Sequence, residues 1–162
     1  KRQLAHGDPA SDIPSAALAL RASFIIEGPS GEREVGADDF FTGFLETALE
    51  PEELLTEIRV PKLPNSKWSF QKFNRRAQDW AIVGASVLIA DNQCGVGLVN
   101  MDFKPVRAAA LEEAIESGAS AEEASLLAAD GLEPPSDLNA STEYRSHLAR
   151  VLTKRGLQES GK

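Results

Sequence analysis

The chain has 162 residues, of which 42% are hydrophobic and 26% charged, as is typical of a globular protein rather than a disordered one. The net charge of -8 argues against a nucleic-acid partner. The single cysteine, Cys94, excludes an internal disulfide and a four-cysteine metal site within the chain. A chain without disulfides fits a cytoplasmic location. The longest apolar run, residues 81–90, is too short to span a bilayer, so we expect no transmembrane segment.

Residues 4–12 form a dense run of turn and ligand-capable residues. A loop of this composition normally follows a glycine turn that brings backbone N–H groups to a phosphate, so the run predicts part of a binding site. Residues 14–20 then predict a short helix with Pro14 in its first turn. Asp12 stands just before this helix, where an aspartate is usually an N-cap. The alternative is that its carboxylate accepts hydrogen bonds from the hydroxyl groups of a ligand.

The chain up to residue 61 predicts a hairpin, a helix and one more strand. The expected elements are a strand at 22–27, a turn at 28–31, a returning strand at 33–35, a helix over 38–45 and a strand at 54–60. In the last strand Leu55 shares a face with Glu57 and Arg59, so its side chain makes either a packing contact or a ligand contact. Residues 62–67 predict an exposed linker, and we place a subdomain boundary there.

The second half predicts an antiparallel meander of three strands followed by three helices. We expect strands at 68–74, 81–90 and 95–101, with the turn Asp91-Asn92-Gln93 between the last two, and helices over 106–117, 120–130 and 141–156. The strand 81–90 has no polar alternation, so it is predicted to be central and covered on both faces. Ser120 predicts a capping box, Ser141 or Thr142 a second cap, and Gly156 a helix end. A meander with helices on one face is an α+β arrangement.

Other polar segments allow both a structural and a functional interpretation. Lys72, on the same strand face as Phe70, is by itself most simply a solvated lysine. Residues 75–80, which include two arginines and a tryptophan, form either an exposed turn or a contact with an anionic cofactor or a partner protein. Residues 134–141 form either an elaborate helix cap or a contact between subunits. The acidic pairs at 112–113 and 122–123 are interpreted as solvent-facing or capping residues.

No catalytic template occurs within the chain. The GxSxG, P-loop, HExxH and CxxC motifs are absent, and the two histidines, His6 and His147, stand at opposite ends. The sequence therefore predicts neither a self-contained active site nor a metal site, and a binding role has to be sought in the segments named above.

Five segments in order resemble the FAD-binding medium subunit of molybdenum hydroxylases, the carbon monoxide dehydrogenase and xanthine dehydrogenase flavoprotein family. They are the opening run 4–12, residues 40–58 with Phe-Phe-Thr-Gly and Glu-Leu-Leu-Thr-Glu-Ile, residues 70–83 with Phe-Gln-Lys-Phe-Asn-Arg-Arg and Asp-Trp-Ala-Ile-Val, Pro105-Val106-Arg107-Ala108, and residues 135–148 with Pro-Ser-Asp-Leu and Tyr-Arg. Each segment is short, but together they cover nearly the whole chain. One departure is that Lys1-Arg2-Gln3 stand where the family has Gly-Gly-Ser.

The resemblance implies the end of an FAD-binding (PCMH-type) domain at residues 1–61 and the small C-terminal domain of the flavoprotein at 67–162, with part of the cofactor site outside the chain. It places Asp12, Leu55 and Lys72 where family members contact FAD. The implied function is an oxidoreductase subunit that passes electrons from iron–sulfur clusters through FAD to an acceptor.

The implied partners are a large subunit with the molybdenum cofactor and a small subunit with [2Fe–2S] clusters. The alternative is a non-catalytic docking module with a vestigial flavin site, which the departure at residues 1–3 favours.

Overall fold

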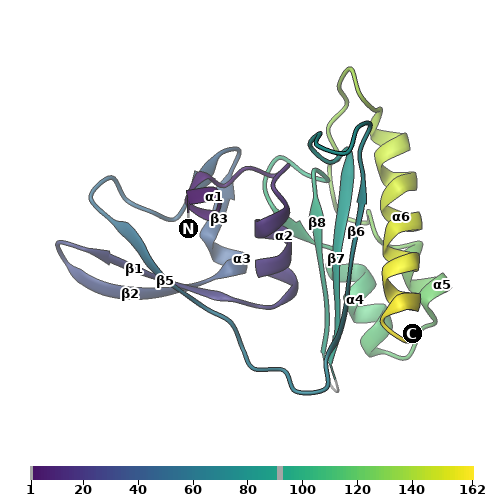
Figure 1. Cartoon of the computed structure of the whole chain (residues 1–162), viewed down its shortest axis with the longest axis horizontal. Coiled ribbons are helices and arrows are strands. Elements are labelled where there is room, and N and C mark those ends of the chain that lie inside the picture. Colours follow the sequence, from purple (N-terminus) through teal and green to yellow (C-terminus); the bar gives the residue numbers. More distant parts are fainter. Residues whose placement is uncertain (1, 91–92) are drawn as a thin grey trace.

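The computed structural model describes residues 2–90 and 93–162, so Asp91 and Asn92 of the expected turn lie outside the described residues. Three antiparallel sheets and the helices between them make an α+β fold, which confirms the predicted class (Figure 1). The elements of the first half are α1 (Arg2–His6), α2 (Asp12–Ala19), β1 (Ser23–Gly28), β2 (Gly31–Gly36), α3 (Ala37–Phe40), β3 (Phe41–Gly43), β4 (Glu46–Thr47) and β5 (Leu54–Arg59).

The first half is built on a sheet of order β2-β1-β5, and the predicted hairpin is its β1–β2 pair. Phe24, Phe40 and Phe41 form its core, with the Phe24 and Phe40 ring centroids 4.4 Å apart. The expected helix over 38–45 is wrong beyond Phe40. Since both Phe40 and Phe41 are buried, the chain leaves the helix there, and Leu45 takes a positive φ of 57° in the turn between β3 and β4.

A β-bulge explains the odd position of Leu55. The pairing of β1 with β5 shifts between Ile25 and Ile26, which lie opposite Glu57 and Leu55 respectively. The extra residue in β5, Thr56, breaks the strict alternation of faces. Leu55 is therefore 9% exposed in the core, while Leu54, which the alternation places on the apolar face, is 72% exposed. The predicted faces of this strand are wrong for that reason.

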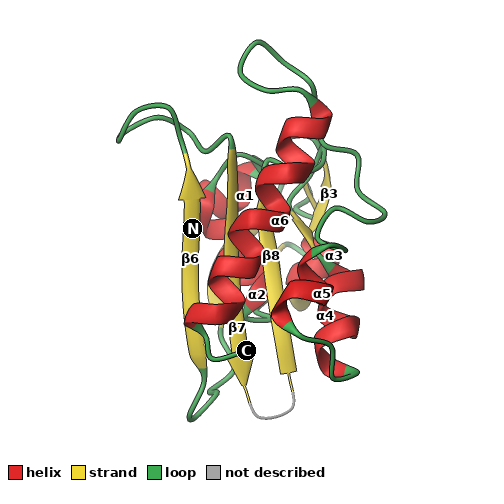
Figure 2. Ribbon diagram, turned by 90° about the vertical axis from the view of Figure 1, so that its right-hand side faces the viewer, coloured by secondary structure: helices red, strands yellow, loops and turns green. Residues whose placement is uncertain are grey.

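The second half is a four-stranded sheet of order β6-β7-β8-β9. Its elements are β6 (Lys67–Phe73), β7 (Val83–Ala90), β8 (Gln93–Val99), β9 (Val106–Arg107), α4 (Ala109–Glu116), α5 (Ala121–Ser125) and α6 (Thr142–Glu159). The predicted meander is β6 to β8, and β7 is central and mostly buried, as expected. Figure 2 shows α4, α5 and α6 together on one face of this sheet.

Three helix ends differ from the expected ones. Residues 106 and 107 pair with β8 as a fourth strand, so α4 begins later than predicted. The capping box of Ser120 is present, but α5 ends at Ser125 because the chain continues in tighter turns with bonds to the third residue back. Gly156 lies inside α6, and an added Cβ there would be 2.6 Å from Val87 Cγ2. It serves close packing on the sheet rather than helix termination.

Helix α2 belongs to the first half in sequence but lies on the second sheet, on the face opposite α6 (Figure 1). Two glycines of β8 permit this close approach. An added Cβ would be 2.0 Å from Ala19 O at Gly95 and 1.9 Å from Ser15 O at Gly97. The buried apolar residues form two separate clusters, one in each half. Helix α2 contributes residues to the first cluster and also packs on β7 and β8 of the second sheet. The boundary at 62–67 stays a prediction.

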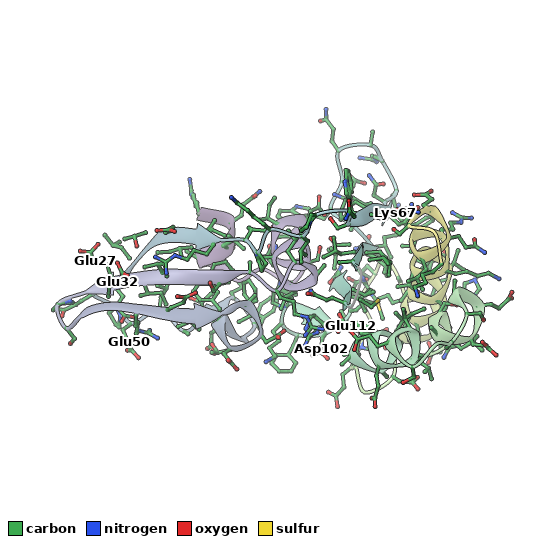
Figure 3. All side chains as sticks on the ribbon, turned by 90° about the horizontal axis from the view of Figure 1, so that it is seen from below. Glu27, Glu32, Glu50, Lys67, Asp102 and Glu112 are labelled. Carbon is green, nitrogen blue, oxygen red and sulfur yellow. The ribbon has the colours of Figure 1, made fainter. Side chains whose placement is uncertain are left out.

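Glu112 connects the two halves and was wrongly expected at the surface. It is 3% exposed and accepts hydrogen bonds from Val96 N (2.6 Å), Arg21 Nη2 (3.1 Å) and Arg107 Nη1. Arg107 Nε also donates to Asp38 Oδ1 at 2.7 Å. Figure 3 shows Glu112 in the middle of the molecule. Burial raises the pKa of Glu112, against the opposing effect of the Val96 N–H and the two arginines.

Candidate functional site

Two of the three predicted cofactor residues meet in the structure. Lys72 Nζ on β6 is 2.9 Å from Asp12 Oδ2 in the first residue of α2, although sixty positions separate them in the chain. Asp12 is not the N-cap of α2. That position belongs to Ser11, and neither residue makes a side-chain capping bond. The structural interpretation of Asp12 as a cap is therefore wrong, and its carboxylate is directed to Lys72 instead.

The Asp12–Lys72 pair lines a pocket of about 260 Å³. The wall is mainly polar and comes from the start of the chain, from β6 and from the loop between β6 and β7. The lining residues are Gln3, Ala10, Ser11, Asp12, Ile13, Lys72, Gln78, Asp79 and Trp80. Trp80 is 63% exposed and offers an aromatic surface there. The arrangement suits a ligand with hydrogen-bonding groups and a flat ring system.

One oxygen of Asp12 has an unmet hydrogen-bonding capacity. Its Oδ1 atom is buried and has no hydrogen-bond partner among residues 2–90 and 93–162, while Oδ2 accepts from Lys72. A buried carboxylate oxygen without a donor is costly, and such sites in native proteins call for a ligand, an ion or a water. Asp12 lines the pocket and its side chain is 40% exposed, so a ligand that donates a hydroxyl or N–H group fits beside its carboxylate.

Leu55 does not join the pair. Its side chain packs in the core of the first half with Leu4 and Phe40, so it makes the packing contact of the two alternatives. It lies on a different sheet from Lys72 and is absent from the wall of the Asp12–Lys72 pocket. A contact of the Leu55 backbone with FAD remains a prediction.

The loop that carries Asp79 and Trp80 to the pocket is anchored by the segment 134–141 and by α6. Arg75 Nη1 donates to Asn139 Oδ1 at 3.1 Å, and the fully buried Arg145 donates to the carbonyl oxygen of Ile82 at the end of the loop. Sequence reasoning noted both segments but not their contact. No residue spacing indicates it, because it depends on α6 returning along β6 and β7.

Asp137 holds Arg145 in place and organises the start of α6. Its Oδ1 accepts from the N–H groups of Asn139 and Ala140, and its Oδ2 accepts from Arg145 Nη2 at 2.7 Å. Slight burial acts to raise the pKa of Asp137, but these N–H groups and the Arg145 guanidinium outweigh it and lower the pKa. Ser141 Oγ accepts from Tyr144 N as the N-cap of α6, which confirms the structural interpretation of segment 134–141 as a helix cap. Its role as a contact between subunits stays a prediction.

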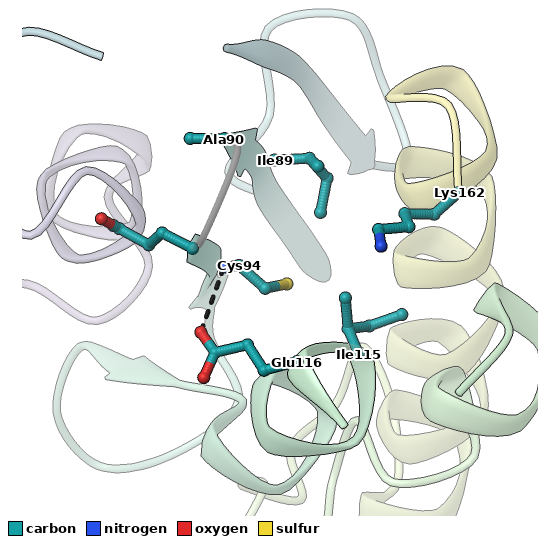
Figure 4. Close-up of a pocket in the computed structure, with 7 residues that line it drawn as sticks. Ile89, Ala90, Cys94, Ile115, Glu116 and Lys162 are labelled. Carbon is teal, nitrogen blue, oxygen red and sulfur yellow. Dashed lines mark hydrogen bonds between the residues drawn. The ribbon is translucent and has the colours of Figure 1, made fainter. Parts of the chain in front are cut away.

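A second pocket, of about 250 Å³, lies at the other end of the sheet (Figure 4). Cys94 and Lys162 line it, and Glu116 accepts a hydrogen bond from Cys94 N at 3.2 Å. Burial, followed by the nearby charges of Glu112 and Glu116, raises the pKa of Cys94 to about 12, so the thiol is not reactive at neutral pH.

In the part of the chain that the structure describes, no group of three or more His, Cys, Asp and Glu residues could hold a metal ion. No helix there is long and apolar enough to cross a membrane.

Residues 68–160, more than half of the chain, match the sequence family described as the CO dehydrogenase flavoprotein C-terminal domain. The chain belongs to this family. Residues 3–63 match a second family, described as the FAD binding domain in molybdopterin dehydrogenase. The family resemblance inferred from the sequence motifs is confirmed.

Similar proteins cover almost all of the chain. It is 35% identical to the carbon monoxide dehydrogenase medium chain of Hydrogenophaga pseudoflava, over 95% of this chain and 57% of the relative. It is 32% identical to the nicotine 6-hydroxylase medium subunit of Paenarthrobacter nicotinovorans, over 98% of this chain and 59% of the relative.

Solved structures give the same result. A carbon monoxide dehydrogenase from Hydrogenophaga pseudoflava that lacks the Mo-pyranopterin moiety matches with a TM-score of 0.89 and 34% identity, over 97% of this chain and 58% of that chain. Quinoline 2-oxidoreductase from Pseudomonas putida 86 matches with a TM-score of 0.83 and 30% identity, over 97% of this chain and 58% of that chain. The family member described here therefore spans less than three fifths of the relatives and structures it matches.

Proposed function

We propose that this chain contributes the Asp12–Lys72 side of an FAD site in an electron-transfer subunit of a molybdenum hydroxylase. The observation that carries the proposal is the meeting of Asp12 and Lys72 at one pocket, with the second carboxylate oxygen of Asp12 buried and lacking a donor. Membership of the flavoprotein family and the match of residues 3–63 to an FAD-binding domain support it. The remainder of the site comes from residues beyond the span that the chain shares with its relatives.

The residues of the pocket fit a part of FAD rather than the whole molecule. The Asp12 carboxylate accepts a hydrogen bond from a hydroxyl or ring N–H of the cofactor, and Lys72 donates to a cofactor oxygen while it balances the Asp12 charge. Trp80 covers a flat ring and limits the access of water to it. When bound, FAD supplies the redox chemistry by taking up electrons and releasing them to an acceptor. The protein positions the cofactor and sets its electrostatic surroundings.

The names of the relatives extend the proposal to partners. Several relatives are medium chains of dehydrogenases, and one matching structure is described as a Cu,Mo-CO dehydrogenase. We place a molybdenum-binding large subunit and a [2Fe–2S] small subunit beside this chain, in the cytoplasm. The exposed residues of segment 134–141, including the fully exposed Leu138, are a candidate contact with one of them. The intact Asp12–Lys72 pair favours a working flavin site over a vestigial one.

The test compares FAD retention by this chain with that by a longer protein extended to match the full length of the relatives. After addition of FAD and removal of the free cofactor, the visible absorbance of bound flavin is measured. The longer protein is expected to retain FAD, and Asp12→Ala or Lys72→Met to raise its dissociation constant about tenfold or more, since hydrogen bonds to charged groups contribute about 1.5–3 kcal/mol.

Matched controls are available within the chain. Lys67→Met removes a lysine from the opposite end of β6, and Asp39→Ala removes an exposed aspartate from the first turn of α3. Both are expected to leave FAD binding unchanged. Unchanged binding in the Asp12 and Lys72 variants would refute their assignment to the site. Folded but colourless protein in both lengths would instead support the docking module.

A further inference from the structure

Two buried hydroxyl groups, those of Ser15 and Ser86, hold the first turn of α2 on the sheet. Their Oγ atoms are 2.8 Å apart, and the residues are 1% and 6% exposed. Ser15 Oγ also donates to the carbonyl oxygen of Asp12 at 2.8 Å. Because a serine hydroxyl carries one proton, Ser86 must be the donor between the two hydroxyls. The hydrogen bonds therefore lead from Ser86 through Ser15 to the backbone of Asp12.

The strand pair that carries Ser86 also determines where Lys72 stands. Ser86 on β7 is directly opposite Phe70 on β6. Lys72 follows Phe70 by two positions, so Lys72 and Ser86 project from the same face of the sheet, the face that α2 covers. Ser86 thus ties the helix that bears Asp12 to the part of the sheet that bears Lys72.

We propose that Ser86 is a positioning residue for the cofactor pair: through Ser15 it fixes the place of the Asp12 carboxylate beside Lys72. This inference rests on the proposed FAD site. Loss of the Ser86 hydroxyl leaves Ser15 without its donor and removes this hydrogen bond between the first turn of α2 and the sheet. Since hydrogen bonds weaken steeply with distance and angle, a small shift of Asp12 lowers its contribution to a bound cofactor.

The experiment measures the FAD dissociation constant of the full-length subunit by flavin fluorescence. Ser86→Ala is expected to raise this constant about fivefold, the equivalent of one ordinary hydrogen bond. Ser86→Thr keeps the hydroxyl and is expected to bind like the unmodified protein, because Ser86 borders an apolar cavity of about 360 Å³ that accepts a methyl group. Ser86→Cys has a weaker donor of similar size, and its FAD dissociation constant is expected to lie between those of the alanine and threonine variants. It replaces the alanine variant if that one does not fold.

A double-mutant cycle separates positioning from general stability. If Ser86 acts through Asp12, then Ser86→Ala in an Asp12→Ala background changes the dissociation constant less than twofold. The control is Ser125→Ala in α5, which removes a serine of similar burial that donates to a backbone carbonyl three residues back, as Ser15 does. Its expected effect on FAD affinity is nil.

The outcomes distinguish the two proposals. Unchanged affinity in Ser86→Ala, with a loss of affinity in Asp12→Ala, overturns the positioning role and leaves the FAD site standing. Additive losses of FAD affinity from Ser86→Ala and Asp12→Ala overturn the positioning role as well, and so does an equal loss of affinity in Ser125→Ala. Unchanged affinity in Asp12→Ala refutes the proposed site, and the positioning role fails with it.

Discussion

Gly97→Ala tests whether α2 is seated directly on β8. An alanine Cβ at this position would lie 1.9 Å from Ser15 O and 2.6 Å from Ser15 C. Carbon and oxygen atoms need a separation of at least about 3.0 Å, so helix and strand must move apart by about 1 Å. The contact atoms belong to the backbone, and a side-chain rotation cannot relieve the clash.

The cost of this clash is set by the surroundings of α2. Overpacking in a well-packed core costs about 1–3 kcal/mol, and the rigid contact at Gly97 places the expected value near 3 kcal/mol. With a urea slope of about 2 kcal/mol per molar, the unfolding midpoint falls by about 1.5 M. Circular dichroism during urea titration measures this shift directly.

Gly36→Ala is the control, since it also adds a methyl group to a strand glycine, but the nearest non-neighbouring atoms lie more than 4 Å from an added Cβ there. It is expected to change the free energy of unfolding by less than about 1 kcal/mol. If Gly97→Ala and Gly36→Ala unfold at the same urea concentration, α2 does not lie on β8 as described, and the geometric basis of the Asp12–Lys72 pair is lost.

Three further predictions concern charges and caps. Ser120→Ala removes the capping box of α5 and is expected to lower the free energy of unfolding by about 1 kcal/mol, measured by thermal denaturation; an unchanged melting temperature would contradict this. The lowered pKa of Asp137 means that its stabilising contribution is present above the ordinary aspartate pKa of about 3.9 and is lost as pH falls through the lowered value. Asp137→Asn is therefore expected to destabilise the protein at pH 7 and to show a shallower loss of stability in acid, and urea titrations that give parallel curves for both proteins would refute it. The pKa of Glu112 is raised, so the pH dependence of its contribution to stability has the opposite sign. That contribution is full below about pH 4.3 and declines as pH rises through the raised pKa. Glu112→Gln is expected to lack this decline in the same pH range, and a variant that retains it would rule out Glu112 as the source.

Local sequence signals predicted most elements correctly. The unbroken apolar run at 83–90 marks the central strand β7, and the serine caps at Ser120 and Ser141 mark the starts of α5 and α6. These features depend on residues close together in the chain. They could be predicted because a strand buried on both faces and a capped helix each have a distinct local composition.

The errors arose where a distant segment decides the local structure. The bulge opposite β1 moves Leu55 into the core, and Arg21 and Arg107 draw Glu112 into the interior. Gly156 does not end a helix but lies inside α6, where its contact with Val87 of β7 leaves no room for a side chain. Apart from Arg107, which stands five residues before Glu112, these partners lie far in the sequence from the residues they affect, so no local pattern indicates them.

The candidate site shows the same division. Residue composition alone favoured a cap for Asp12 and a solvated side chain for Lys72, and only the resemblance to the flavoprotein family brought both into one site. Their contact depends on α2 crossing to the second sheet, which the glycines of β8 permit. That crossing is a property of the fold rather than of either segment.

A crystal structure of the full-length subunit with FAD bound tests directly whether Asp12 and Lys72 belong to the cofactor site. We expect a hydroxyl or N–H group of FAD within about 3.2 Å of the Asp12 carboxylate, with Lys72 Nζ still paired to Oδ2. A structure in which FAD is bound elsewhere and Asp12 makes no contact with it would refute the assignment of Asp12 to the site.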